Sequence, residues 1–177
     1  MRSLFEDLDL AVFKKVMDVN FYGTVYATKY ALPHILSKRG SIVGISSING
    51  HRATPARSAY SASKFAMEGF LESLRTEVMY RGVHVLSACP GFTATNIRNN
   101  ALTSDGKLQR ESPRDEGKMM TAQEAADQIY KAVVSRKRDL VLTAQGKLAV
   151  FLNKWMPGRM DKIVYNVMAK EPDSPLK

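Results

Sequence analysis

Apolar residues return every three to four positions over two long stretches of the chain, which is the period of an amphipathic helix. The first stretch, residues 8–37, predicts one long helix with a kink or an early end at Pro33. The second runs from Ala59 to about Arg81, and Gly82 then occupies the position where helices often end. Two long helices are therefore expected in the first half of the chain.

Three short runs of β-branched and other apolar residues predict buried strands. They cover residues 40–47, 83–91 and 139–143. Between the last two runs, residues 121–137 open with the capping-box pair Thr121 and Glu124 and predict a further helix. Strands that alternate with long helices indicate an α/β fold with a parallel sheet covered on both faces.

Three strands are few for a doubly wound parallel sheet, and each edge strand here is apolar. We therefore expect a partial fold, with about three strands and long flanking helices. Residues 92–120 are polar and predict a long mobile excursion, while the chain after residue 145 predicts two amphipathic helices broken at Pro157-Gly158.

Composition and charge narrow the class of protein. The 177 residues are 45% hydrophobic, as in ordinary globular domains, and no apolar run approaches the ~18 residues of a membrane span. The net charge of +9 would suit a nucleic-acid partner. However, the sequence has no zinc-ligand spacing, no aromatic stacking residues and no recognition-helix pattern, so no nucleic-acid partner is expected. A single cysteine and an N-terminus unlike a secretory signal favour the cytoplasm.

The segment SAYSASKF, residues 58–65, places Tyr60 and Lys64 on one helix face among small side chains. A nearby ammonium group favours the phenolate, so Lys64 can lower the pKa of Tyr60 from its ordinary value of about 10. The two residues can form an acid–base pair beside a surface open to a flat ligand. A surface pair without a role is the alternative that spacing alone leaves open.

Other motifs lie where open parallel sheets bind ligands, at the carboxyl ends of strands. Ser46-Ser47 ends the first predicted strand, and Pro90-Gly91 ends the second. Three further motifs accompany Ser46-Ser47: N-x-x-G at 20–23, Y-S-A-S-K at 60–64 and P-G-x-x-x-T at 90–95. With these four motifs in this order, the chain resembles the short-chain dehydrogenase/reductase family. The resemblance implies a Rossmann-like doubly wound sheet and reversible carbonyl–alcohol interconversion with NAD or NADP.

The resemblance also assigns roles to residues. It implies that Tyr60 exchanges the proton with the substrate oxygen, that Ser47 hydrogen-bonds this oxygen, and that Lys64 holds the nicotinamide ribose. Asn20 is implied in a water-mediated proton relay from Lys64. Cofactor binding is implied for Tyr60, Lys64, Pro90, Gly91, Thr93 and Thr95.

The glycine-rich turn with which the family binds pyrophosphate does not occur in this sequence. We therefore expect only the second, catalytic half of the family fold, as in a fragment of a longer oxidoreductase, with residues 1–145 as Rossmann-like domain and 146–177 as helical extension. The residue that selects NAD or NADP belongs to the absent region. A non-catalytic interaction module is the alternative.

Substrate and partners are less defined. The apolar C-terminal region and residues 96–120, long enough for a lid, favour an apolar or lipid-like carbonyl or alcohol, although packing within a dimer explains the apolar residues equally. His51 joins Ser47 and Tyr60 as a candidate substrate-lining residue. The two long helices predict a homo-oligomer, a dimer or tetramer, and peripheral membrane contact of the C-terminal helices stays open. The spacing of the three histidines argues against a metal, and Cys89 is expected to be an inert buried thiol.

Overall fold

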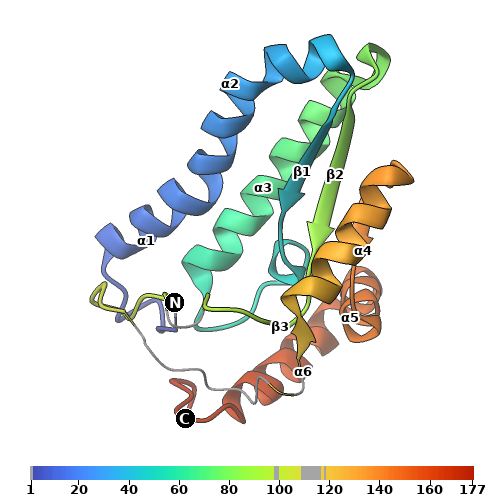
Figure 1. Cartoon of the computed structure of the whole chain (residues 1–177). Coiled ribbons are helices and arrows are strands. Elements are labelled where there is room, and N and C mark those ends of the chain that lie inside the picture. Colours follow the sequence, from blue (N-terminus) through green and yellow to red (C-terminus); the bar gives the residue numbers. More distant parts are fainter. Residues whose placement is uncertain (1, 98–99, 109–116, 118) are drawn as a thin grey trace.

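A three-stranded parallel sheet lies at the centre of the computed structural model, which describes residues 2–97, 100–108, 117 and 119–177 (Figure 1). The strands β1 (Ser41–Ile45), β2 (His84–Cys89) and β5 (Asp139–Val141) are hydrogen-bonded in the order β1-β2-β5. In this register Ile42 lies beside Val85. All three predicted strands are confirmed, as is the parallel α/β sheet.

The first long helix is continuous from residue 10 to residue 38 but changes its winding. It consists of α1 (Leu10–Met17), a π-helical segment (Asp18–Tyr22) and α2 (Gly23–Lys38). Pro33 lies inside α2, so the early end predicted there is wrong. The proline removes one N–H group from the helical ladder, but the helix continues for five residues beyond it, to Lys38.

The remaining helices follow the predicted order. They are a 3₁₀ turn (Ile48–Gly50), α3 (Ser58–Glu77), a second 3₁₀ turn (Met79–Arg81), α4 (Ala122–Val134), α5 (Ala144–Trp155) and α6 (Pro157–Ala169). Gly82 ends the α3 region with a φ of 76°, and the capping box of Thr121 and Glu124 opens α4. The predicted helix boundaries and the break before Pro157 are thus confirmed to within a few residues.

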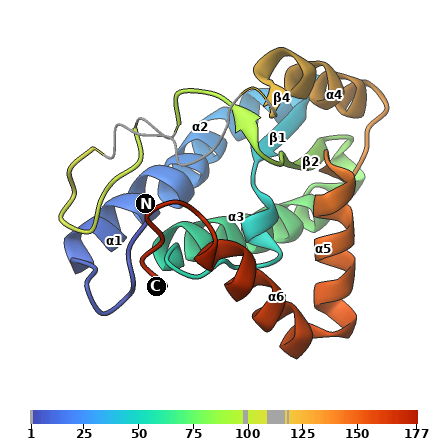
Figure 2. The same ribbon diagram turned by 90° about the horizontal axis from the view of Figure 1, so that it is seen from below.

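Alternate residues of the strands divide the core between the two faces of the sheet. Ile42 and Val85 pack with Leu71 of α3 on one face, where α2 adds partly buried side chains. Leu86 on the other face packs with Ala132 of α4. Figure 2 shows the sheet between α3 and α4. Both faces are covered, as the near-continuous apolar strands predict.

Gly44 allows α3 to approach the sheet closely. A Cβ atom at this position would lie 2.3 Å from Cδ1 of Leu71, whose side chain is fully buried. Any larger residue would push the helix and the sheet apart. The spacing between α3 and β1 therefore depends on this glycine.

The long segment after β2 contributes a second, smaller pairing. β3 (Thr93–Ala94) lies parallel to β4 (Met120–Thr121), which leads directly into α4. Part of the predicted lid, residues 98–99, 109–116 and 118, lies outside the described residues.

The C-terminal segment returns to the start of the chain. Glu171 is buried and forms ion pairs with Arg2 at 3.7 Å and with Arg57, at the start of α3, at 3.3 Å. The two ends of the chain lie close together in both views (Figures 1 and 2). Among the described residues, no helix is both long and apolar enough to span a bilayer.

The Gly44→Ala substitution is expected to lower the free energy of unfolding by about 1–3 kcal/mol, because the new methyl group overlaps Leu71. Gly69→Ala is the matched control, since nothing lies within 4 Å of a Cβ atom there. In the control, alanine favours the helix by up to about 1 kcal/mol. Urea unfolding of the three proteins measures the difference, and equal losses in both variants would contradict the close approach.

Candidate active site

Helix α3 places Tyr60 and Lys64 side by side at the carboxyl end of β1. The Lys64 side chain is only 9% exposed, and its ammonium Nζ donates a hydrogen bond of 2.9 Å to the carbonyl oxygen of Ile45. The same Nζ lies 5.8 Å from the centre of the Tyr60 ring. The i, i+4 spacing thus brings both groups to the sheet edge where ligands of open α/β folds bind.

Ser47 reaches the same place from the end of β1. It caps the 3₁₀ turn, and its hydroxyl accepts a hydrogen bond of 3.2 Å from the backbone N–H of Asn49. The Ser47 side chain also acts on the Tyr60 phenol, whose pKa it lowers. Ser47, Tyr60 and Lys64, which are separate in the sequence, therefore form one cluster.

The electrostatics of Tyr60 differ from the expectation based on spacing. Burial raises the pKa of Tyr60, while the hydrogen bond from Ser47 and the positive charge of Arg57 partly oppose this rise. Burial also lowers the pKa of Lys64, whose ammonium group is directed to the Ile45 carbonyl. In the protein without ligand, the Tyr60 phenol is therefore protonated at neutral pH.

Asn20 lies in the π-helical segment and is connected to the tyrosine through α3. Its side-chain Nδ2 donates a hydrogen bond of 3.1 Å to Ser63 Oγ, which in turn donates one of 2.7 Å to the Tyr60 carbonyl oxygen. Thr24 Oγ1 donates to the Asn20 carbonyl oxygen at 2.9 Å. The mid-helix asparagine is thus explained by a contact between the two long helices.

The Pro90-Gly91 loop follows β2 at the same edge of the sheet. A Cβ atom on Gly91 would lie 2.5 Å from Cγ2 of Thr143, the N-cap of α5, so only glycine fits there. Thr93 Oγ1 donates to the Gly91 carbonyl oxygen at 3.3 Å, and Thr95 Oγ1 accepts from the Ile97 N–H at 3.4 Å. The structure places these residues next to β2, with the Thr95 side chain on an exposed stretch.

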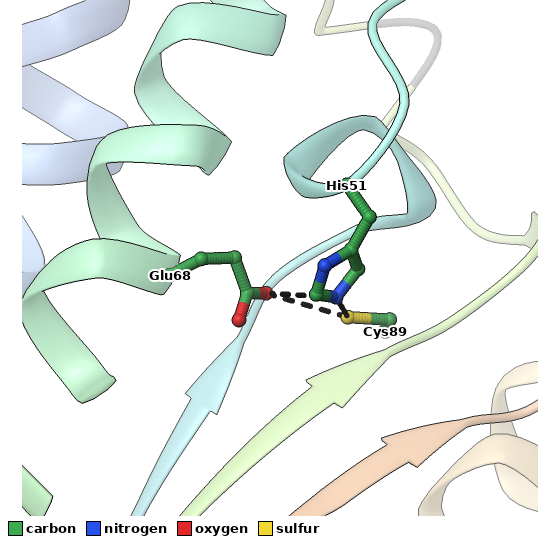
Figure 3. A group of neighbouring side chains, drawn as sticks. All are labelled: His51, Glu68 and Cys89. Carbon is green, nitrogen blue, oxygen red and sulfur yellow. Dashed lines mark hydrogen bonds and ion pairs between the residues drawn. The ribbon is translucent and has the colours of Figure 1, made fainter. Parts of the chain in front are cut away.

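The sequence did not indicate a second polar cluster, formed by His51, Glu68 and Cys89 (Figure 3). Ser87 Oγ lies 2.8 Å from each carboxylate oxygen of Glu68, and the two oxygens share its single proton. The His51 ring faces Glu68 and Cys89, so its predicted role beside a substrate stays a prediction. Glu68 lies one turn beyond Lys64, and this i+4 spacing from the tyrosine–lysine pair is the signal that could have identified it.

Cys89 is almost completely buried within this cluster. Burial, and next the charge of Glu68, raise the pKa of its thiol to about 12. The thiol is therefore neutral at physiological pH in the protein without a metal ion, and the prediction that Cys89 is buried is confirmed.

The chemistry of these donors suits a nicotinamide nucleotide. Ammonium groups donate up to three hydrogen bonds, and one of those available to Lys64 goes to Ile45. The remaining N–H groups of the Lys64 ammonium can donate hydrogen bonds to ribose hydroxyl groups. The hydroxyl groups of Thr93 and Thr95 can form hydrogen bonds with a carboxamide. The types of donor suit the cofactor, and the cofactor roles of the individual residues stay predictions.

Comparison with known proteins adds independent information. A family model described as short chain dehydrogenase matches residues 1–106. Mouse dehydrogenase/reductase SDR family member 7B is 36% identical over 175 residues, which are 98% of this chain and 54% of that protein. The fruit-fly SDR family protein 7-like is 37% identical over 167 residues, 93% of this chain and 48% of the relative. The chain spans about half the length of these curated relatives.

Solved structures agree in fold. A short chain dehydrogenase from Burkholderia cenocepacia, in complex with NADP, has a TM-score of 0.75 at 22% identity, over 93% of this chain and 63% of that one. A short-chain dehydrogenase from Streptomyces avermitilis has a TM-score of 0.65 at 25% identity, over 95% and 64% of the two chains. These similarities confirm the Rossmann-like fold class.

Tyr60 is expected to ionise above the ordinary tyrosine value of about pH 10, because its burial disfavours the phenolate. Because the pKa of Tyr60 is higher in the folded protein than in the unfolded chain, its contribution to stability is fully present below about pH 10. This contribution is lost as the pH rises through the pKa of Tyr60 in the folded protein. The tyrosinate absorbance of the protein minus that of the Tyr60→Phe variant measures the ionisation. A transition below pH 10 would instead support the lowering by Lys64 that spacing suggested.

Proposed function

This chain belongs to the short-chain dehydrogenase family, and on that premise we propose that it carries the proton-transfer residues of an NAD(P)-dependent oxidoreductase. The reaction is the interconversion of a carbonyl and an alcohol. The observation that carries the proposal is the convergence of Ser47, Tyr60 and Lys64 at the carboxyl edge of the sheet. Three separate motifs meet there in the arrangement that such a reaction requires.

Each residue has a distinct task in this proposal. The protonated Tyr60 phenol donates its proton to the carbonyl oxygen as the alcohol forms, and accepts it in the reverse direction. The Ser47 hydroxyl, which acts on the phenol in the protein without ligand, turns its single proton to the same substrate oxygen and stabilises its developing charge. Lys64 supplies positive charge beside the phenol and lowers the cost of forming phenolate.

Asn20 supports this arrangement from the neighbouring helix. Its amide bonds Ser63, whose hydroxyl bonds the Tyr60 backbone, so the π-helical segment helps to fix the start of α3. A water molecule held near Asn20 would connect Lys64 with solvent and restore the proton.

The nicotinamide group supplies the hydride when it is bound. Lys64 and Tyr60 would hold its ribose, and Pro90, Gly91, Thr93 and Thr95 would surround its carboxamide. The Burkholderia relative contains NADP, while the choice between NAD and NADP in this chain stays open. We propose further that this chain corresponds to the catalytic second half of the family fold.

An apolar substrate is supported by the C-terminal helices. Phe151 and Trp155 of α5 are 59% and 74% exposed, and their rings lie 6.4 Å apart. Asn153 of the same helix donates a hydrogen bond of 3.1 Å to the carbonyl oxygen of His51, which joins α5 to the loop after Ser47. Phe151 and Trp155 lie on a different face of α5 from Asn153, and this exposed aromatic pair is what favours a lipid-like carbonyl or alcohol.

Tyr60→Phe is expected to lower turnover about 10²–10⁴-fold, because it removes the proton donor and leaves the ring in place. Tyr80→Phe is the matched control, since Tyr80 is 93% exposed on the second 3₁₀ turn. The assay follows NADPH and NADH oxidation with a panel of apolar ketones and aldehydes, and calorimetry records cofactor binding. Circular dichroism verifies that each variant is folded.

Equal turnover in the two tyrosine variants would contradict the assignment of Tyr60. If the chain neither turns over nor binds either nucleotide, the enzyme proposal fails for this chain by itself, and the interaction module described next becomes the better account.

A binding role is the second candidate, and a row of exposed aromatic residues favours it. Tyr22, Tyr26 and Tyr30 repeat every four residues along the first long helix and are 43%, 59% and 79% exposed. The rings of Tyr22 and Tyr26 stack at 6.0 Å. Such a row suits the interface of a homo-oligomer or of a complex with a relative.

Tyr26→Glu is expected to weaken self-association about 30-fold, which corresponds to about 2 kcal/mol for a central aromatic contact. Tyr130→Glu on α4 is the matched control, because Tyr130 is 69% exposed on another face. Light scattering coupled to size-exclusion chromatography measures the mass. A protein that is monomeric throughout, or equally affected by both substitutions, contradicts the predicted interface.

A further inference from the structure

The cluster of His51, Glu68 and Cys89 is not used by the proposed proton transfer, although its three side chains are all metal-ligand types. They come from three different elements: the end of the first 3₁₀ turn, α3 and the last residue of β2 (Figure 3). His51 Nε2 lies 3.4 Å from Cys89 Sγ and 3.7 Å from Glu68 Oε1, and the sulfur lies 3.4 Å from the same oxygen. We propose that these three groups bind one Zn²⁺ ion.

The distances match the coordination geometry of zinc. Zinc–ligand bonds of about 2.0–2.3 Å that meet at tetrahedral angles place neighbouring ligand atoms about 3.3–3.6 Å apart. The three distances of 3.4, 3.4 and 3.7 Å fall within a few tenths of an ångström of that range. An ion can therefore enter the triangle with small side-chain movements, and its fourth position is left for water.

The ligand types and their surroundings also suit this ion. A thiolate, a neutral imidazole and a carboxylate form a mixed set that favours zinc over magnesium or calcium. Binding moves the Cys89 thiol proton to solvent and leaves the buried group without net charge. Ser87 holds Glu68 through both carboxylate oxygens, and Asn153 holds the His51 backbone, as supporting residues around metal sites commonly do.

An ion can reach the site from the histidine side. The side chains of His51 and Glu68 are 30% and 17% exposed, while Cys89 is almost fully covered. The buried Lys64 ammonium interacts with Cys89 and Glu68 and therefore reduces the affinity for a dication. We expect a bound ion to join the Ser47–His51 turn to α3 and β2.

Calorimetric titration of the chelator-treated chain with ZnCl₂ is expected to give one equivalent per chain. Co²⁺ as a spectroscopic probe is expected to give tetrahedral absorption and a near-ultraviolet thiolate band. Cys89→Ser removes the band, and Cys89→Ser and His51→Gln each lower the zinc affinity about tenfold or more. His34→Gln is the matched control, because His34 is exposed on α2.

Circular dichroism verifies the fold of each variant. If Cys89→Ser does not fold, Glu68→Gln and His51→Gln decide the question. The proposal is overturned by an absence of stoichiometric zinc binding, by a cobalt complex without the thiolate band, or by an affinity that His51→Gln leaves unchanged. In these cases the cluster is a hydrogen-bonded group of a neutral thiol, an imidazole and a carboxylate.

Discussion

The close approach of α3 to the sheet is the constraint on which the rest of the structure depends. Leu71 of α3 occupies the space that a side chain at Gly44 would take. Tyr60, Lys64 and Glu68 precede it at helical spacing and therefore face the carboxyl ends of β1 and β2. The contact between Leu71 and Gly44 thus fixes the distance between α3 and the sheet, and with it the positions of the three polar groups at the strand ends.

Burial determines how these polar groups behave. The ammonium group of Lys64 is shielded from solvent and donates a hydrogen bond to the Ile45 carbonyl oxygen. This burial lowers the pKa of Lys64. Tyr60 is held in its protonated form by burial, while Arg57 opposes this effect. Because Arg57 is also paired with Glu171, the C-terminal segment contributes to the charge around the tyrosine. Electrostatic tuning here involves residues at both ends of the chain.

Much of the fold could be predicted from the sequence because hydrophobic period and end signals act locally. The three strands, the capping box of α4 and the helix break before Pro157 all follow from neighbouring residues. One helix over residues 8–37 was predicted, with a kink or an early end at Pro33, and the early end is wrong because a proline in a helix removes a single bond and tertiary packing can compensate. The π-helical turn around Asn20 was also missed, because the local sequence does not show the contact that Asn20 makes with Ser63 of α3.

The site could be predicted where its residues share an element or a familiar spacing, as Tyr60 and Lys64 do. The direction of the Tyr60 pKa could not, because spacing reports a neighbouring charge but not the loss of solvent. The His51, Glu68 and Cys89 cluster was missed because its members lie on three elements without a regular interval. Here the histidine spacing argued against a metal, yet the parallel register and the turn after Ser47 bring the three ligand types together.

Ser47 and His51 lie at opposite ends of the same 3₁₀ turn, which links the two polar clusters physically. Ser47 caps the turn and lowers the pKa of Tyr60, while His51 ends the turn and contacts Glu68 and Cys89. A turn held at both ends has few ways to move, so the position of the Ser47 hydroxyl depends on contacts made by His51. In the proposed reaction, Ser47 would therefore be positioned in part by the contacts that His51 makes with Glu68 and Cys89.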